Sequence, residues 1–250
     1  RTDFKENNII KANYNNVSSA KLCTTLENSF GAEVSTVEHL MAAFYISGID
    51  NITVEIDNNE VPIMDGSSKD FINLIENTGL KQLQAKRKYL KILKKVQLTK
   101  DQKFISIEPS SETFDVSFEL SYGNKIIGNQ KNHINFKNNN LFNVYSSRTF
   151  CLFEDIEKIK KSGLAKGGSL ENAVVVKGEE VLNEGGLRND KEFVNHKILD
   201  LAGDFLLSGY RILGSVKCVQ GGHQLSNVFL RNLLSDKSNY TEIVVNNIEL

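Results

Sequence analysis

The sequence predicts an α+β fold built from two stretches of chain that carry the same kinds of elements. Apolar and polar residues alternate over several short runs, such as Ile52, Val54 and Ile56, and this is the period of a half-buried strand. Longer runs with helical spacing lie between them and stop at glycines such as Gly48 and Gly79. With 250 residues and 40% hydrophobic composition, the chain is large enough for one large domain or two ordinary ones.

The first part of the chain is predicted to form strand, helix, strand and helix in one small α+β domain. Residues 8–22 are expected to form strand and loop. A helix is expected over 37–47, with Ser35 or Thr36 capping its start and Gly48 ending it. The next elements are a half-buried strand over 49–56, a turn at 57–59, and a helix over 69–77 that Ser67 and Ser68 cap and Gly79 stops.

Residues 81–100 join the two parts and carry eight Lys or Arg residues among Leu, Ile and Val. Such a strip could face phosphate or a membrane. The favoured interpretation is the exposed face of a linker and strand, because like charges at alternate positions are usually solvated. We therefore expect a first domain over residues 1–85 and a second over 86–250.

The second part is predicted to repeat this order of sheet, helix, strand and helix. Alternation from Tyr89 to Leu120 indicates strands, and the polar run 129–133 is interpreted as a solvated loop that holds His133. The other predicted elements are a loop at 138–140, a short helix over 153–161, a strand over 173–176, a long helix over 190–208, a strand over 210–219, a helix over 224–234 and a strand over 240–245.

Composition and charge exclude several classes of protein. The 30 basic and 31 acidic residues nearly cancel, whereas a nucleic-acid-binding protein shows a concentrated basic excess. No run approaches the roughly 20 apolar residues that span a bilayer. Cys23, Cys151 and Cys218 are scattered and form no CxxC pair, which is typical of reduced thiols in the cytosol.

His196 and Asp200 are four residues apart in the predicted long helix, so their side chains project from one face about one turn apart. An imidazole and a carboxylate so placed can hold one divalent cation. A zinc site with three ligands and an open fourth position is a hydrolytic arrangement. A His/Asp pair at this spacing is more often a surface hydrogen bond, so the spacing alone leaves both interpretations open.

The use of the other histidines favours a metal site. His39 directly follows Glu38, and His223 follows two glycines. A third metal ligand beside a carboxylate, and a histidine on a turn that glycine permits, are the parts that a metal hydrolase still needs. Glu38 also lies in the first turn of the predicted helix over 37–47, where it could serve only to complement the helix dipole.

Ordered motifs run along nearly the whole chain. They are STVEHLMAA at 35–43, GIDN at 48–51, PIMDGS at 62–67, SRTF at 147–150, GGS at 167–169, LNE at 182–184, GLR at 186–188, the stretch 193–200, and Gly222-His223. In this order they resemble the UDP-3-O-acyl-N-acetylglucosamine deacetylase family. The resemblance implies a zinc-dependent cytosolic enzyme of lipid A biosynthesis. It also implies two similar domains, each with helices layered against β-sheets, and an active site in the cleft between them.

The resemblance further implies roles for single residues. His39, His196 and Asp200 become the ligands of zinc (Zn2+), in agreement with the helical spacing of the last two. Glu38 becomes the general base that takes a proton from the attacking water. His223 becomes the cationic general acid that protonates the leaving amine.

Other residues match positions around the reacting group. Thr149 matches a hydroxyl that donates to the tetrahedral oxyanion, and Asp204 matches the carboxylate that orients the catalytic histidine. Lys197 matches a lysine that contacts the substrate. The segment near 150–176 matches an insertion that forms an apolar passage for the acyl chain. Its predicted substrate-contacting residues are Phe150, Leu152 and Phe153.

The predicted function is removal of acetate from UDP-3-O-(3-hydroxyacyl)-N-acetylglucosamine, the committed step of lipid A biosynthesis. We expect a monomeric cytoplasmic enzyme whose partner is this nucleotide-sugar lipid, with no nucleic acid and at most peripheral membrane contact. Two alternatives stay open: a zinc hydrolase of another amide or ester, and a truncated or degenerate relative that binds metal or lipid without turnover. The family has further strands before the position of Arg1, so we expect the sequence to begin inside a longer protein.

Overall fold

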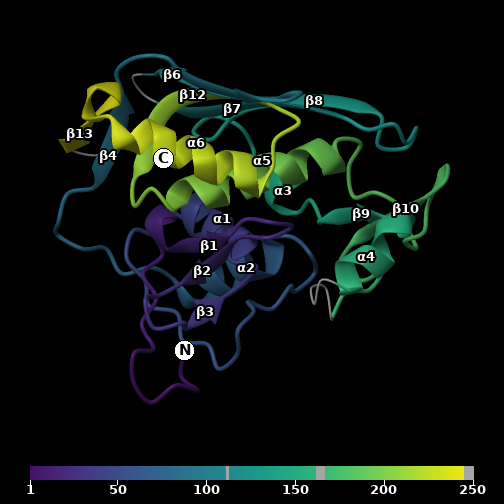
Figure 1. The fold of residues 1–250 in the computed structure, drawn as a ribbon, viewed down its shortest axis with the longest axis horizontal. Coiled ribbons are helices and arrows are strands. Elements are labelled where there is room, and N and C mark those ends of the chain that lie inside the picture. Colours follow the sequence, from purple (N-terminus) through teal and green to yellow (C-terminus); the bar gives the residue numbers. More distant parts are fainter. Residues whose placement is uncertain (111–112, 162–166, 245–250) are drawn as a thin grey trace.

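The computed structural model describes residues 1–110, 113–161 and 167–244 of the chain. These residues form four layers: a small sheet, a first pair of helices, a second pair of helices and a large sheet (Figure 1). A further small sheet projects at one end, beside a short helix (Figure 1). The α+β class predicted from the sequence is confirmed.

The first small sheet is antiparallel and covers one side of the first helical layer. Leu26 of the sheet shares one apolar cluster with Met41 and Phe44 of helix α1. Helix α2 adds its partly buried Phe71 and Ile75 to the same cluster. The elements are η1 (Tyr14–Asn16), β1 (Val17–Ser19), β2 (Thr25–Glu27), β3 (Glu33–Val34), α1 (Glu38–Ile46) and α2 (Lys69–Thr78).

Helix α1 begins without the predicted side-chain cap. Val37 occupies the N-cap position, where no side chain bonds to the helix. The Ser35 hydroxyl instead accepts a hydrogen bond from Thr25 Oγ1 at 3.0 Å. Thr36 takes a left-handed backbone conformation, with φ of 59°, and its hydroxyl donates to Glu60 Oε1 at 3.0 Å. The predicted cap was wrong because both hydroxyl groups bond to other strands and loops.

The predicted strand over 49–56 is not formed. Residues 51–56 have no strand assignment, and Ile52 and Val54 are 52% and 46% exposed. A strand needs a neighbouring strand to complete its backbone hydrogen bonds. In this run the carbonyl of Ile56 accepts from the amide of Thr2 at 2.8 Å and from the Thr2 hydroxyl at 3.3 Å, but Thr2 is not part of a strand. An alternating pattern alone does not supply that neighbour.

The large sheet is built around β12. The first part of β12 pairs in parallel with β4, and the rest lies between antiparallel β6 and parallel β7. The outer strands β13, β5 and β8 pair antiparallel with β4, β6 and β7. The strands are β4 (Lys88–Ile92), β5 (Val96–Lys100), β6 (Lys103–Pro109), β7 (Phe114–Ser121), β8 (Asn129–Asn135), β12 (Arg211–Val219) and β13 (Tyr240–Val244). Of the strand predicted over 240–245, Val245 lies outside the described residues.

His133 lies within β8 and not in a loop, so that prediction was wrong. Its side chain is exposed, and its Nδ1 lies 2.8 Å from Ser117 Oγ on the neighbouring strand β7. The polar composition of 129–133 predicted solvation correctly. It did not exclude a strand, because one face of this sheet is open to water.

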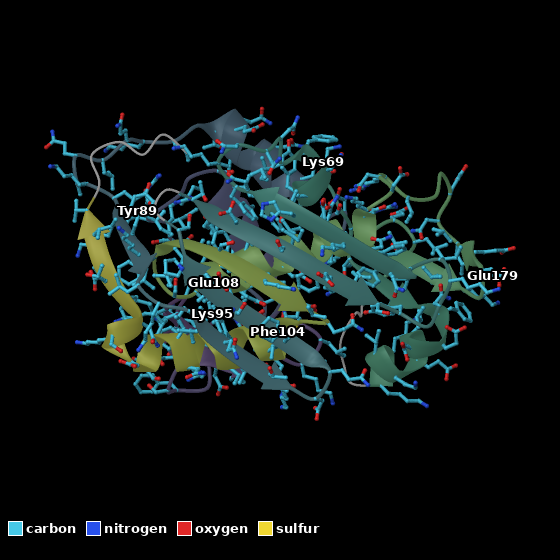
Figure 2. All side chains as sticks on the ribbon, turned by 90° about the horizontal axis from the view of Figure 1, so that it is seen from above. Lys69, Tyr89, Lys95, Phe104, Glu108 and Glu179 are labelled. Carbon is cyan, nitrogen blue, oxygen red and sulfur yellow. The ribbon has the colours of Figure 1, made fainter. Side chains whose placement is uncertain are left out.

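Helices α5 (Glu192–Leu206) and α6 (His223–Ser235) cover the inner face of the large sheet. Phe193, Ile198 and Phe205 of α5 lie in one buried cluster with Ile107 and Val116 of the sheet. The opposite face of the large sheet carries polar side chains. On this face Lys95 and Glu108 form an ion pair at 2.7 Å (Figure 2). None of the described helices is long and apolar enough to cross a membrane.

The projecting sheet consists of three short strands in the order β11-β10-β9. The helix predicted over 153–161 is formed, as a 3-10 turn followed by α4. Residues 162–166 of the predicted insertion lie outside the described residues. The elements are α3 (Phe142–Tyr145), β9 (Phe150–Leu152), η2 (Phe153–Asp155), α4 (Ile156–Lys161), β10 (Val174–Lys177), β11 (Glu180–Val181) and η3 (Lys237–Asn239).

Candidate metal centre and active site

Helices α1 and α5 bring together His39, His196 and Asp200. The two helices pass so closely that a Cβ on Gly203 would lie 2.1 Å from the carbonyl oxygen of Glu38. Asp200 Oδ1 lies 3.5 Å from His39 Nε2 and 3.3 Å from His196 Nε2. One donor atom of each of the three side chains lies within 4.8 Å of the others, and all three residues are buried.

The donor set and its surroundings fit a divalent cation. Asp200 Oδ1 is buried and has no hydrogen-bond partner among the described residues, which is costly for a carboxylate oxygen unless a cation lies against it. His196 Nδ1 donates to the carbonyl of Ser147 at 3.0 Å, so Nε2 carries the lone pair. Burial lowers the pKa of His196 to about 3, which keeps the ring in the neutral form that binds metals. Two imidazole nitrogens and one carboxylate suit zinc.

His223 lies beside this group at the start of α6. Its Nδ1 donates to Asp204 Oδ2 at 2.9 Å, and its Nε2 lies 3.6 Å from Glu38 Oε1. Burial lowers the pKa of His223, but the carboxylates of Asp204, Glu38 and Asp200 outweigh this effect and raise the pKa to about 10. The imidazole is therefore a cation at neutral pH.

Glu38 is a buried carboxylate in contact with that cation. Burial raises its pKa, and the nearby His223 and His39 offset only part of the rise. A carboxylate with a raised pKa is a stronger base, which suits proton abstraction. The hypothesis that Glu38 merely complements the helix dipole does not account for its contact with His223.

Lys197 is held against the same carboxylate as the histidines. Its Nζ donates to Asp200 Oδ2 at 2.8 Å and lies 5.5 Å from the ring centroid of Phe150. Burial lowers the pKa of Lys197, but the charge of Asp200 and the hydrogen bond to it raise the pKa above its ordinary value. The lysine therefore stays charged beside the site.

Phe150 lies between the group of His39, His196 and Asp200 and the projecting sheet. Its ring lies 4.9 Å from that of Phe193 and 6.3 Å from that of His196. Leu152 is half-buried, and Phe153 at the outer end is 43% exposed with Lys177 Nζ 4.5 Å above its ring. The predicted passage residues thus run from the buried histidines to the surface.

Thr149 begins the same run. Its amide donates to the carbonyl of Gly66 at 2.7 Å, and its carbonyl accepts from the amide of Val174 at 2.8 Å. Ser147, two residues earlier, supplies the carbonyl that orients His196. The backbone around Thr149 is therefore attached to His196 through the carbonyl of Ser147.

A buried ion pair that the sequence reasoning missed holds this backbone to α5. Glu192 is 0% exposed and accepts from the amide, Nε and Nη2 of Arg148 at 2.8–3.1 Å. It also accepts from the amide of Arg188 at 2.7 Å. Both arginines lie in motifs that the sequence highlighted without a role, SRTF and GLR, and this was the available signal.

The other features noted in the sequence lie outside the site. Four of the eight basic residues in 81–100 are paired with carboxylates, as expected for a solvated face: Arg87 with Asp50, Lys88 with Glu242, Lys94 with Asp236, and Lys95 with Glu108.

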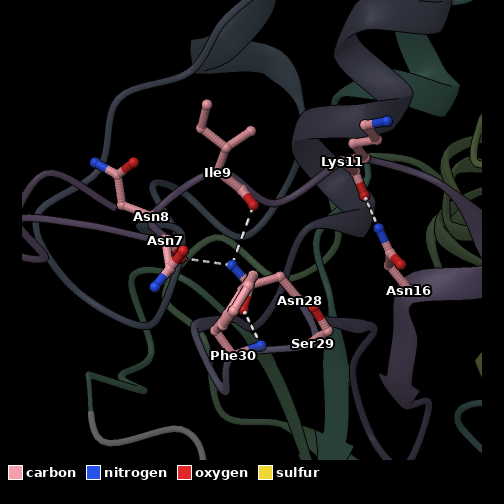
Figure 3. A pocket seen from close by; sticks show the side chains of 8 residues that line it. All are labelled: Asn7, Asn8, Ile9, Lys11, Asn16, Asn28, Ser29 and Phe30. Carbon is pink, nitrogen blue, oxygen red and sulfur yellow. Dashed lines mark hydrogen bonds between the residues drawn. The ribbon is translucent and has the colours of Figure 1, made fainter.

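A surface hollow near the amino-terminal end is lined by Asn7, Asn8, Ile9, Lys11, Asn16, Asn28, Ser29 and Phe30 (Figure 3). Its central amide, Asn28, donates to the carbonyls of Asn7 and Ile9, so these groups already bond to one another (Figure 3).

Comparisons with known proteins agree with the motifs. A family model described as UDP-3-O-acyl N-acetylglycosamine deacetylase matches residues 1–235. The chain is 40% identical to a UDP-3-O-acyl-N-acetylglucosamine deacetylase of Nautilia profundicola over 89% of this chain and 75% of the relative. It is 37% identical to that of Haemophilus ducreyi (95% and 79% covered) and 36% identical to that of Helicobacter pylori (92% and 77%). A match over most of the chain, with relatives aligned over most of their own length, means that this protein belongs to the UDP-3-O-acyl N-acetylglycosamine deacetylase family.

Proposed function

We propose that this protein removes acetate from UDP-3-O-(3-hydroxyacyl)-N-acetylglucosamine in lipid A biosynthesis and depends on zinc. The observation that carries the proposal is the buried group of His39, His196 and Asp200, with Glu38 and His223 in contact beside it. Family membership supports the substrate class. We infer that the protein acts as a cytoplasmic monomer, with at most peripheral membrane contact and no nucleic-acid partner.

We also propose that residues 1–85 and 86–250 are the two domains of this enzyme. Helix α1 of the first part carries Glu38 and His39, and α5 of the second carries His196 and Asp200. Both parts would then be needed for a complete ligand set, and the site would lie where they meet.

The proposed reaction breaks the amide C–N bond of the N-acetyl group and adds water across it. His39, His196 and Asp200 would hold zinc, which would supply a Lewis acid and lower the pKa of a water molecule. Glu38 takes the proton of the attacking water, and the cationic His223 gives its Nε2 proton to the leaving amine. The products are acetate and the free amine.

The remaining residues orient these groups and the substrate. Asp204 accepts from His223 Nδ1, which directs Nε2 toward the leaving nitrogen. The Thr149 hydroxyl is proposed to donate to the oxyanion, and Lys197 to contact the substrate. The acyl chain is proposed to lie along Phe150, Leu152 and Phe153.

Metal content and acetate release test the proposal together. Elemental analysis of the purified protein should find one zinc per chain, and the nucleotide substrate should release acetate. His196→Ala and Asp200→Ala should each lose the metal, because three ligands leave none to spare. His133→Ala, on the exposed face of β8, should keep it.

Two outcomes would contradict the proposal in different ways. Unchanged zinc in both ligand variants would show that the metal site lies elsewhere. Stoichiometric zinc without acetate release from any nucleotide-sugar lipid would favour the non-catalytic relative.

The acyl passage is tested by a charge placed within it. We expect Leu152→Glu to reduce kcat/KM for a long-chain substrate far more than for a short one, with zinc retained. Each buried methylene contributes about 0.8 kcal/mol, so removing four carbons should by itself cost the wild-type enzyme about two orders of magnitude in kcat/KM. Leu93→Glu, at an exposed position between β4 and β5, is the matched control. Equal losses on both substrates would place the acyl chain elsewhere.

A further inference from the structure

Thr24 contacts both carboxylates that flank His223. It lies just before β2, is 2% exposed, and belongs to none of the motifs noted in the sequence. Its amide donates to Glu38 Oε2 at 3.0 Å, and its hydroxyl donates to Asp204 Oδ1 at 2.7 Å. Its carbonyl accepts from the amide of Val37, the residue at the N-cap of α1, at 3.3 Å.

In each of the two carboxylates, one oxygen is bonded to Thr24 and the other faces His223. In Glu38, Oε2 is bonded to Thr24, while Oε1 lies 3.6 Å from His223 Nε2. In Asp204, Oδ1 is bonded to Thr24, while Oδ2 accepts from His223 Nδ1 at 2.9 Å. Neither carboxylate can rotate about its last bond without breaking a hydrogen bond to Thr24. One residue directly before β2 thus sets the orientation of two carboxylates that come from two different helices.

We propose that Thr24 is a positioning residue, which orients the base Glu38 through its amide and the His223–Asp204 pair through its hydroxyl. The inference rests on the proposed deacetylase function. Proton transfer to and from a reacting group depends on alignment, and a misplacement of about 1 Å can reduce turnover roughly 100-fold. A hydroxyl that served only the packing of the small sheet would affect stability and leave turnover unchanged.

Thr24→Val removes the hydroxyl, keeps the shape of the side chain, and leaves the backbone amide on Glu38. We expect kcat to fall about 10- to 100-fold, in the range for misaligned general catalysis, with KM and zinc content unchanged. Thr24→Ser, which keeps the hydroxyl, should restore most of kcat. The matched control is Thr25→Val: the Thr25 hydroxyl is also buried but donates to Ser35 Oγ at 3.0 Å, away from the site. It should lower the melting temperature without lowering kcat.

A double substitution shows whether the effect runs through Asp204. If it does, Thr24→Val should reduce kcat much less in an Asp204→Asn background than in the wild type, because the shared hydrogen bond is already altered. Independent losses of equal size in both backgrounds would contradict the proposed route.

The proton NMR spectrum of the zinc-loaded protein gives a readout that does not need turnover. The His223 Nδ1–H proton bonded to Asp204 should shift in Thr24→Val and stay in place in Thr25→Val. An unmoved resonance with a wild-type kcat would overturn the role of Thr24. Wild-type protein that releases no acetate, but shows the shifted resonance in Thr24→Val, would overturn the proposed function and leave the positioning of His223 by Thr24 supported.

Discussion

At Glu38 and His223, the proposed base and acid, burial and charge act on the two pKa values in different ways. Burial by itself disfavours both charged forms, raising the pKa of the carboxylate and lowering that of the imidazole. The three carboxylates around His223 reverse the direction of the pKa shift for the imidazole, whereas His223 and His39 do not reverse it for the carboxylate of Glu38. The pair therefore contains a carboxylate with raised basicity and a histidine that holds its proton.

Substitution of either residue should separate catalysis from metal binding. We predict that Glu38→Gln and His223→Gln keep one zinc per chain, because neither side chain is a proposed ligand. Turnover should fall by about two orders of magnitude or more, as expected when a general base or acid is lost. Initial rates of acetate release and elemental analysis measure the two effects. Glu179→Gln, on an exposed side chain at one end of the molecule that pairs with Lys125 (Figure 2), should match the wild type in both. Loss of zinc in His223→Gln would contradict the assignment.

The contact between helices α1 and α5 brings the proposed ligands together. Each helix carries a proposed ligand within one turn of the point where Gly203 meets the Glu38 carbonyl. A side chain at Gly203 would meet backbone atoms, since the Ala42 amide nitrogen is also only 3.0 Å from the Cβ position. Backbone cannot move aside as a flexible side chain can, so glycine sets the separation of the two helices.

A single methyl group at this contact should disrupt the site. In Gly203→Ala the helices must move apart, which should lower the melting temperature and weaken zinc binding, with overpacking costs of about 1–3 kcal/mol. Calorimetry and competition with a zinc chelator measure the two effects. Gly123→Ala, where the new Cβ meets no atom within 4 Å, should change neither. Tight zinc binding by Gly203→Ala would show that the ligand geometry does not depend on this contact.

At the scale of the whole molecule, a loop of the first part is tied to the second part by an ion pair. Asp65 Oδ2 accepts from Arg188 Nη1 at 2.7 Å, and Arg188 also donates to the carbonyl of Ser146. Nearby, the hydroxyl of Ser68 donates to the carbonyl of His39 at 2.6 Å. The bonds of Arg188 join the loop before α2 to the segment that orients His196, and the bond of Ser68 joins this loop to α1.

The pH dependence of stability tests this connection. Burial raises the pKa of Asp65, but hydrogen bonds from Ser67 and Arg188 outweigh it and hold the pKa below its ordinary value. A lowered folded-state pKa adds stability above the ordinary value of about 3.9, and this stability is lost as the pH falls through the folded-state pKa. Asp65→Asn should therefore be less stable than the wild type at pH 7, by about 1 kcal/mol.

The difference between Asp65→Asn and the wild type should shrink as the pH falls below about 3.9. Urea unfolding of both proteins from pH 7 to pH 3 measures it. Asp57→Asn, in an exposed turn, should show no such difference at any pH. A gap between Asp65→Asn and the wild type that stays constant with pH would mean that the Asp65 charge does not stabilise the fold.

The sequence by itself determined the elements whose signal is local. The long helix was predicted because its apolar spacing repeats along α5, and the spacing of His196 and Asp200 on one face follows from helix geometry alone. The alternation from Tyr89 to Leu120 predicted strands of the large sheet for the same reason. The positions of the other histidines drew attention to His39 and His223, and the family motifs gave these residues expected roles.

Only the tertiary structure decided which segments pair as strands and which side chains bond to one another. The run 49–56 has the pattern of a strand, but no described strand pairs with it, whereas His133 lies in a strand because β7 lies beside it. The bond from Thr24 to Asp204 joins residues 180 positions apart, and the ion pair of Arg148 and Glu192 joins residues 44 positions apart. A hydrogen bond depends on both partners, and a pattern read along one segment contains only one of them.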